Sequence, residues 1–308
     1  MRRAGIAPPL LRPPARDVRR RDARYFLAGG GDLRPRVGRA IELARFAPGQ
    51  TVVDLGCGRG EAAAHAAGRG ARVIALDYSL EALAMTRATA AVVAAGSGPG
   101  PVGAASPARP SVAACDATSL PLADGCADRV LWLDVVEHLW PWQVDAALAE
   151  VRRILRPDGF VVIHTLPNRW ALAVGYPLLR CVSPGLPANP RSAYERAVHV
   201  NEQSPRSLAR SLAAAGFHGR VWVEEWSTVQ AGRQTDDDRY PDRHRTLGYP
   251  TLRRPVVRRL AGLAMRTPLR WCVGNDIFAV ASPARESASP AARDTIGGDR
   301  RRRRAGPR

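Results

Sequence analysis

The sequence predicts an α/β protein built on a mostly parallel β-sheet with helices on both faces. Short segments rich in Val, Ile and Leu alternate with segments of helical composition along most of the chain. A glycine-rich turn directly follows the first apolar segment, in "TVVDLGCGRGE" at residues 51–61. Strands that alternate with helices pair in parallel and are buried on both faces, and ligands of such sheets bind where the strands end.

Seven short apolar segments are expected to be strands. They are residues 51–55, 72–77, 111–116, 129–134, 160–166, 220–227 and 276–282. Helices are expected at residues 34–46, 61–70, 79–95, 143–155, 204–217 and about 255–266. Ser79 and Ser204 stand where helix N-caps are expected, and Pro205 then occupies a first helical position. The sequence "RPDG" at residues 156–159 is expected to close the helix before the fifth strand.

The composition is strongly basic, with a formal net charge of +18 over 308 residues and no lysine. We expect disordered tails at residues 1–24 and 284–308, which are rich in Arg and lack apolar periodicity. The last sixteen residues contain no aromatic side chain, which favours a solvated tail over a nucleic-acid-binding segment. Five widely spaced cysteines suit reduced thiols in a cytoplasm, and no apolar run reaches the length of a membrane span.

The glycine turn favours a cationic nucleoside over a dinucleotide. A dinucleotide-binding turn requires a small residue where Glu61 stands, because the helix packs closely against the strand there. The spacing here is G-x-G-x-G, at Gly56, Gly58 and Gly60, and Asp54 precedes it. A carboxylate beside the turn would repel a pyrophosphate but suit the ammonium and sulfonium of S-adenosylmethionine. Glycine lets the backbone approach such a ligand without an intervening Cβ.

Carboxylates also end the next two strands. Asp77 ends the second strand, where its oxygens can accept hydrogen bonds from both hydroxyls of a ribose. Asp116 ends the third strand and Ala117 follows it, so a carboxylate and a backbone N–H can contact an adenine edge there. A single Asp often only caps a helix or a turn, but these residues all fall at the carboxyl ends of strands, in order.

Here the chain resembles the class I S-adenosylmethionine-dependent methyltransferases, of the type that acts on small molecules, over residues 33–283. The motifs are "VVDLGCGRG", "ALDYS", "CDATSLPLADGCADRVLWLDVVEHL", "EVRRILRPDGFVVIHTLPN" and "HVNEQSPRSLARSLAAAGF". The resemblance implies a seven-stranded sheet whose last strand inserts antiparallel between its neighbours. It also implies one methyltransferase domain at residues 25–283, with substrate-lid excursions at 168–200 and 228–275.

The resemblance further implies which residues contact S-adenosylmethionine. The matching positions are Asp54, Gly56, Gly58, Gly60, Asp77, Asp116 and Asp134, and their neighbours Cys57, Tyr78 and Ala117 are expected in the same site.

A second group of polar residues lies in "DVVEHLW", after the fourth strand. Asp134, Glu137 and His138 share one face if this segment is helical. It is similar to the E-x-x-E-H metal motif of ubiquinone-biosynthesis O-methyltransferases and small-RNA 2′-O-methyltransferases, with Asp134 in place of the first Glu. A divalent metal is therefore an alternative, with His199 or His164 as a fourth ligand. We favour a site without metal, in which Glu137 and His138 orient the loop or accept a proton.

The sequence therefore predicts a cytoplasmic enzyme that moves a methyl group from S-adenosylmethionine to a small organic acceptor, at oxygen before nitrogen or carbon. The apolar segment at residues 169–182 favours an aromatic or lipid-like acceptor, and it could alternatively rest on a membrane surface. Trp140 and Trp142 could line the acceptor site or pack in the core. The alternatives are an RNA methyltransferase that uses the basic surface, although nucleic acid is the less favoured partner, and a non-catalytic cofactor-binding accessory protein.

Overall fold

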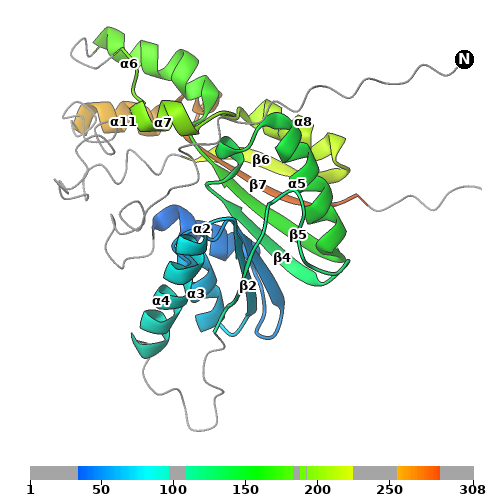
Figure 1. Ribbon diagram of the computed structural model, residues 1–308. Coiled ribbons are helices and arrows are strands. Elements are labelled where there is room, and N and C mark those ends of the chain that lie inside the picture. Colours follow the sequence, from blue (N-terminus) through cyan, green and yellow to red (C-terminus); the bar gives the residue numbers. More distant parts are fainter. Residues whose placement is uncertain (1–33, 97–108, 183–187, 192, 225–254, 285–308) are drawn as a thin grey trace, which may run out of the picture.

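The computed structural model describes residues 34–96, 109–182, 188–191, 193–224 and 255–284 (Figure 1). The expected tails and much of the excursion at 228–275 lie outside the described residues, so the predictions made for them stay predictions.

The described residues form one seven-stranded sheet in the order β3-β2-β1-β4-β5-β7-β6. The strands are β1 (Thr51–Leu55), β2 (Arg72–Asp77), β3 (Ser111–Ala114), β4 (Ala127–Leu133), β5 (Leu155–Thr165), β6 (Phe217–Glu224) and β7 (Asp276–Pro283). The first five pair in parallel, whereas β7 lies between β5 and β6 and runs antiparallel to both. The predicted fold class, including the antiparallel last strand, is confirmed.

Helices cover both faces of the sheet (Figure 1). One layer consists of α2 (Pro35–Ala44), α3 (Glu61–Gly68) and α4 (Leu80–Gly96), and the other of α5 (Pro141–Ile154) and α8 (Pro205–Ala214). Strand residues alternate between the two layers, as a period of two requires. Val52 packs with the α2–α3–α4 layer and Val53 with the α5–α8 layer, and Val162 and Ile163 divide in the same way.

Further helical segments join and flank these layers. They are the 3₁₀ turn η1 (Val136–His138), the π-helical turn η2 (Ala171–Gly175), α6 (Tyr176–Val182), α7 (Ala193–Val198), α11 (Pro255–Ala264) and α12 (Arg270–Val273). The chain enters η2 and α6 after the carboxyl end of β5, and it leaves α12 at the start of β7, where Ile277 lies opposite Thr165. These helices therefore stand at the carboxyl edge of the parallel strands, where the sequence places the site.

Two helix starts follow the predicted capping chemistry. The Ser204 hydroxyl accepts a hydrogen bond from the Ser207 backbone N–H at 3.1 Å, and the Ser79 hydroxyl accepts one from the Ala82 N–H at 3.2 Å. Each bond satisfies a donor that the first turn of a helix leaves without an intrahelical partner.

The helix α5 ends at Ile154, next to the predicted end at residue 155, but the expectation that "RPDG" lies between this helix and the fifth strand is wrong, because β5 already begins at Leu155, opposite Ala127. The register between β4 and β5 shifts just after this pair. Arg156 forms an ion pair of 2.6 Å with Asp128 on β4, which holds the irregular segment against the sheet. A β-strand with such an irregularity can carry turn-type residues such as Pro157 and Gly159.

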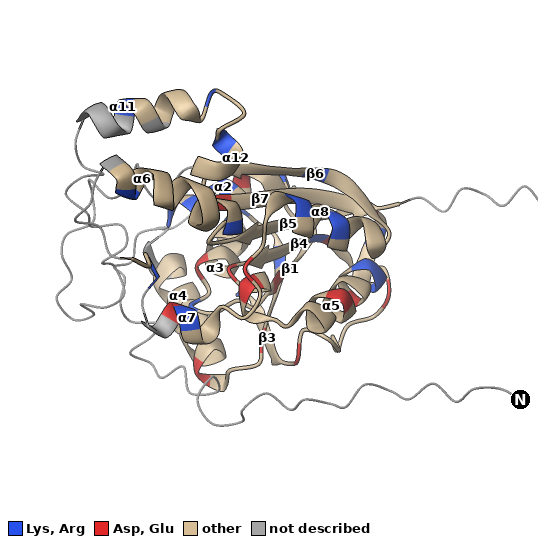
Figure 2. Cartoon of the chain, turned by 90° about the horizontal axis from the view of Figure 1, so that it is seen from above, with Lys and Arg blue, Asp and Glu red and all other residues tan. Residues whose placement is uncertain are grey.

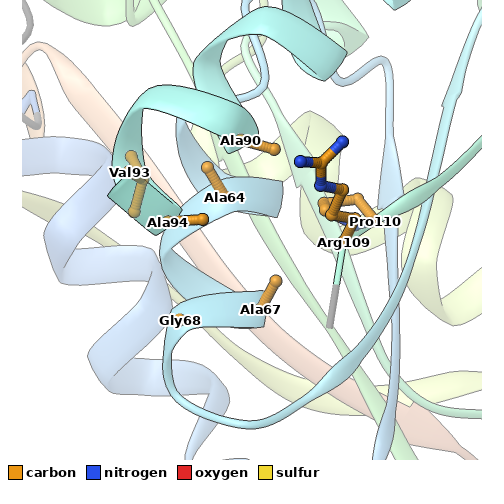
Figure 3. Close-up of a pocket in the computed structure, with 8 residues that line it drawn as sticks. All are labelled: Ala64, Ala67, Gly68, Ala90, Val93, Ala94, Arg109 and Pro110. Atoms are coloured by element: carbon orange, nitrogen blue, oxygen red, sulfur yellow. The ribbon is translucent and has the colours of Figure 1, made fainter. Parts of the chain in front are cut away.

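Two hollows lie away from the carboxyl edge. Figure 3 shows the first, between α3 and α4, where Ala64 and Ala90 face each other beside Arg109. Its volume of about 10 Å³ would hold a single water molecule and no organic acceptor. The second is an open hollow of about 430 Å³ between α2 and β6, lined by residues that include Arg39 and Trp222. No predicted site residue lines either of them.

Candidate active site

The glycine turn connects β1 to α3 and lies against the end of β2. The Gly56 and Cys57 N–H groups both donate to the Leu76 carbonyl, at 2.8 and 2.9 Å, and the Gly58 N–H donates to Oδ2 of Asp77 at 2.9 Å. Gly56, Gly58 and Gly60 all have positive φ, of 76°, 52° and 76°. The turn thus follows a path that residues with a Cβ rarely adopt.

Close packing within the protein supplies a second reason for two of these glycines. A Cβ on Gly56 would stand 2.3 Å from Cγ2 of Val135, which follows β4, and one on Gly60 would stand 2.6 Å from Cα of Thr86 on α4. The ends of β1 and β4, and the helices α3 and α4, therefore approach each other through missing side chains. Close packing within the protein thus requires glycine at these two positions, in addition to the close approach of a ligand that the sequence analysis gave as the reason.

Asp54 and Cys57 are held inside the turn. Asp54 is buried, and its Oδ2 accepts a hydrogen bond of 3.0 Å from the Ala63 N–H in the first turn of α3. Burial, with the charges of Asp77 and Glu61, raises the pKa of Asp54 to about 7. Burial likewise raises the pKa of the Cys57 thiol, which accepts a hydrogen bond from the Thr86 hydroxyl. A cation placed beside Asp54 would favour its ionised form.

The expected nucleoside residues stand around the ends of β2 and β3. The Asp77 carboxylate is aligned by two backbone donors, the Gly58 N–H and the Ser79 N–H, the latter at 2.9 Å. Tyr78 beside it is half exposed. Asp116 is exposed and accepts hydrogen bonds from the N–H and hydroxyl of Thr118, and Ala117 follows it. The Cys115 N–H donates to the Asp77 carbonyl, which ties the two strand ends together.

Asp134 lies in a partly buried ionic network that the sequence did not suggest. It has a left-handed φ of 56° directly after β4. Its Oδ1 contacts Nδ1 of His164, its Oδ2 lies 2.9 Å from Arg36, and Arg34 approaches the same oxygen at 3.4 Å. His164 continues the network through Nε2 to Asp276, at 3.0 Å. The predicted contact between Asp134 and S-adenosylmethionine stays a prediction. A cofactor at this position would share the Asp134 carboxylate with Arg36 and His164.

The network sets the charges of its members. Burial would raise the pKa of Asp134, but the facing charges of Arg36 and His164 hold it well below its usual range. Burial would lower the pKa of His164, but Asp134 and Asp276 raise it to about 9. His164 is therefore an imidazolium that donates from both nitrogens. The sequence analysis did not identify Arg36 or Asp276 as members of this network. The one available signal was Asp276 itself, a charged residue at the start of the apolar strand "DIFAVAS".

Three of the candidate metal ligands come together. Glu137, His138 and His199 each offer one ligand atom, and these atoms all lie within 4.8 Å of one another. The other two candidate ligands, Asp134 and His164, are hydrogen-bonded to each other and lie outside this cluster. Nδ1 of His138 lies 3.1 Å from the Val198 carbonyl oxygen, which favours the tautomer with its proton on Nδ1 and a lone pair on Nε2. A carboxylate and two imidazoles fit a divalent transition metal by donor type.

Glu137 is the carboxyl group of this cluster. Its side chain is buried, and Oε2 accepts a hydrogen bond of 2.7 Å from the Thr165 hydroxyl at the end of β5. Burial and the nearby negative charge of Asp134 raise the pKa of Glu137 to about 7. The carboxyl group can therefore gain or lose a proton at neutral pH. Trp140 and Trp142 follow the cluster, and both are too exposed for the core role that was one of their two interpretations.

Comparisons with known proteins agree with this geometry. Residues 53–163 match a family model described as a methyltransferase domain. A demethylmenaquinone methyltransferase from Mycobacterium sp. (strain KMS) is 30% identical, over 59% of this chain and 70% of the relative. A probable S-adenosylmethionine-dependent methyltransferase from Mycolicibacterium smegmatis is 31% identical, over 57% of this chain and 54% of the relative. The chain thus spans only about half the length of some curated relatives that it matches.

A solved structure shows the same fold. Geranyl diphosphate C-methyltransferase from Streptomyces coelicolor A3(2), in complex with Mg²⁺, geranyl diphosphate and S-adenosyl-L-homocysteine, has a TM-score of 0.52 at 14% identity, over 81% of this chain and 77% of that one. From the sheet topology, the family match and the similarity to the Mycobacterium relative together, we conclude that this chain belongs to the class I S-adenosylmethionine-dependent methyltransferases.

Proposed function

We propose that the chain transfers the methyl group of S-adenosylmethionine to a hydroxyl oxygen of an aromatic or lipid-like small molecule. The sulfonium is already an activated methyl donor, so the protein has to align the acceptor with it and receive the acceptor's proton. The residues of the glycine turn and Asp77 fit the donor. Gly56, Gly58 and Gly60 of the turn have positive φ, the Gly58 N–H donates to the Asp77 carboxylate, and the buried Asp54 lies near the end of β1, just before the turn.

The observation that supports oxygen as the target is the position of Glu137 and His138. Both follow β4 directly, and the glycine turn contacts this segment at Val135. In the proposed step, the acceptor oxygen forms a bond to the methyl carbon as the carbon–sulfur bond breaks. The hydroxyl proton passes to Nε2 of His138, with the Glu137 carboxylate behind it balancing the imidazolium charge. A tertiary amine acceptor, which has no proton to lose, would not need such a pair.

The test uses the full chain, a labelled methyl donor and fractionated lysate, and the labelled product is identified by mass. Glu137→Gln and His138→Gln should each lower kcat by about 10²- to 10⁴-fold, the usual contribution of a positioned proton acceptor, while S-adenosylhomocysteine still binds. His65→Gln on α3 is the matched histidine control and should leave turnover unchanged. The wild-type rate should rise as the pH passes through about 7, where Glu137 loses its proton, and Glu137→Gln should lack this rise.

Each other outcome has a distinct meaning. Labelled RNA would overturn the proposed substrate class, and donor binding without turnover on any fraction would indicate an accessory protein. Loss of turnover on chelation, with rescue by a divalent ion, would replace the proton-acceptor role of Glu137 and His138 by metal ligation together with His199.

A further inference from the structure

We propose that the helices at the carboxyl edge form a docking surface for anionic lipid bilayers. The surface consists of exposed apolar side chains on η2, α6, α11 and the segment before α12. They are Val174, Leu178, Leu260, Leu263 and Leu269, with exposed fractions of 43%, 61%, 61%, 60% and 58%. We call this set the lid face. It does not rest on the proposed reaction, because bilayer binding is measured without turnover.

The elements that carry the lid face belong to one structural unit. η2 contacts both α6 and α12, and α12 contacts α11. Figures 1 and 2 both show α6 and α11 at the same end of the molecule. Met265 and Trp271 pack against the hydrophobic core and anchor the segment between α11 and β7. Leu260 and Leu263 lie three residues apart on α11 and so project from one side of it.

The charge on the helices of the lid face has a single sign. Residues 252–274 include six arginines and no acidic residue, and η2 with α6, residues 171–182, include Arg180 and no acidic residue. Arg180, Arg259, Arg266 and Arg270 are exposed. Apolar side chains next to arginines, without carboxylates, are typical of helices that lie in the headgroup region of an anionic bilayer. A protein partner of mixed charge would not require so one-sided a composition.

The contact would be peripheral. Among the helices that the structure describes, none has the length and apolar content needed to cross a bilayer. The long arginine side chains can reach the lipid phosphates while the leucines enter the acyl boundary. Because the lid face is carried by the carboxyl edge of the sheet, docking would place Glu137 and His138 close to the bilayer, where an apolar acceptor would be dissolved.

The experiment measures co-sedimentation of the full chain with vesicles. Vesicles of phosphatidylcholine are compared with vesicles in which part of that lipid is replaced by phosphatidylglycerol, at low and high salt. The wild type should bind the anionic vesicles and be released by salt, which screens the arginine–phosphate attraction. The double variant Leu260→Ser, Leu263→Ser should bind at least about tenfold more weakly, because the apolar contact is lost without any change of charge.

Val92→Ser is the matched control. Val92 has an exposed fraction of 72% and lies near the end of α4, away from the lid face, so this variant should bind like the wild type. Circular dichroism establishes that each variant is folded. The proposal is overturned if the wild type does not sediment, if it binds both kinds of vesicle equally, or if the double variant binds undiminished. It is also overturned if light scattering shows that the lid face joins two copies, with the double variant monomeric.

Discussion

Replacing Gly60 by Ala should destabilise the protein far more than replacing a glycine of similar backbone conformation elsewhere. At φ 76° an alanine incurs about 1–2 kcal/mol from its left-handed conformation. Its Cβ would also lie 2.6 Å from Cα of Thr86, whereas non-bonded carbons prefer about 3.5–4.0 Å. Because that atom belongs to the backbone of α4, the two helices must separate, at a further cost of about 1–3 kcal/mol.

Gly49→Ala provides the comparison. Gly49 has a φ of 82°, and a Cβ there would meet no atom within 4 Å, so it incurs the conformational cost alone. Urea unfolding followed by circular dichroism should therefore give a free energy of unfolding about 1–3 kcal/mol lower for Gly60→Ala than for Gly49→Ala. Equal midpoints and slopes for the two variants would refute the reasoning, because they would mean that the contact between α3 and α4 relaxes without cost.

Two further measurements address the ionic network and a helix start. His164 has a pKa raised from 6.5 to about 9, so its contribution of about 3 kcal/mol is complete below pH 6.5 and lost as the pH rises through 9. The unfolding free energy should fall over that window, and His164→Gln should abolish the fall; an unchanged slope would show that His164 is neutral in the folded protein. Ser204→Ala should lower the unfolding free energy by about 1 kcal/mol, since the Ser207 N–H loses its acceptor, whereas Ser111→Ala, at an exposed position of β3, serves as the neutral reference. Equal midpoints of thermal unfolding for the two serine variants would contradict this prediction.

The alternation of short apolar strands with helices was sufficient to predict a mostly parallel sheet, whereas the antiparallel last strand was predicted from the family resemblance alone. The positions of Asp54, Asp77 and the glycines followed from the same pattern, because strand ends are visible as the points where apolar runs stop. The roles of Gly56 and Gly60 in packing could not be predicted, since the atoms they approach, in Val135 and Thr86, are distant in the chain.

The spacing of residues in the sequence also could not show which histidine lies next to His138. His164 and His199 were equivalent candidates as partners of His138, and only the fold separates them. β5 and β7 direct His164 toward Asp276, whereas the segment after α7 brings His199 to His138, with ring centroids 4.8 Å apart. The ion pair between Arg36 and Asp134 joins the first helix to the residue after β4, 98 positions along the chain, and leaves no periodic signal, which is why Arg36 was missed.

The ionic network also makes the first helix part of the electrostatics of the sheet. Arg36 lies on α2, outside the residues 53–163 that match the family model. Arg36 and the neighbouring Arg34 both face Asp134, so a fragment that starts at β1 would lack both arginines and leave Asp134 and Asp276 with the single positive charge of His164. The segment that matches the family model thus carries an uncompensated negative charge when the first helix is removed.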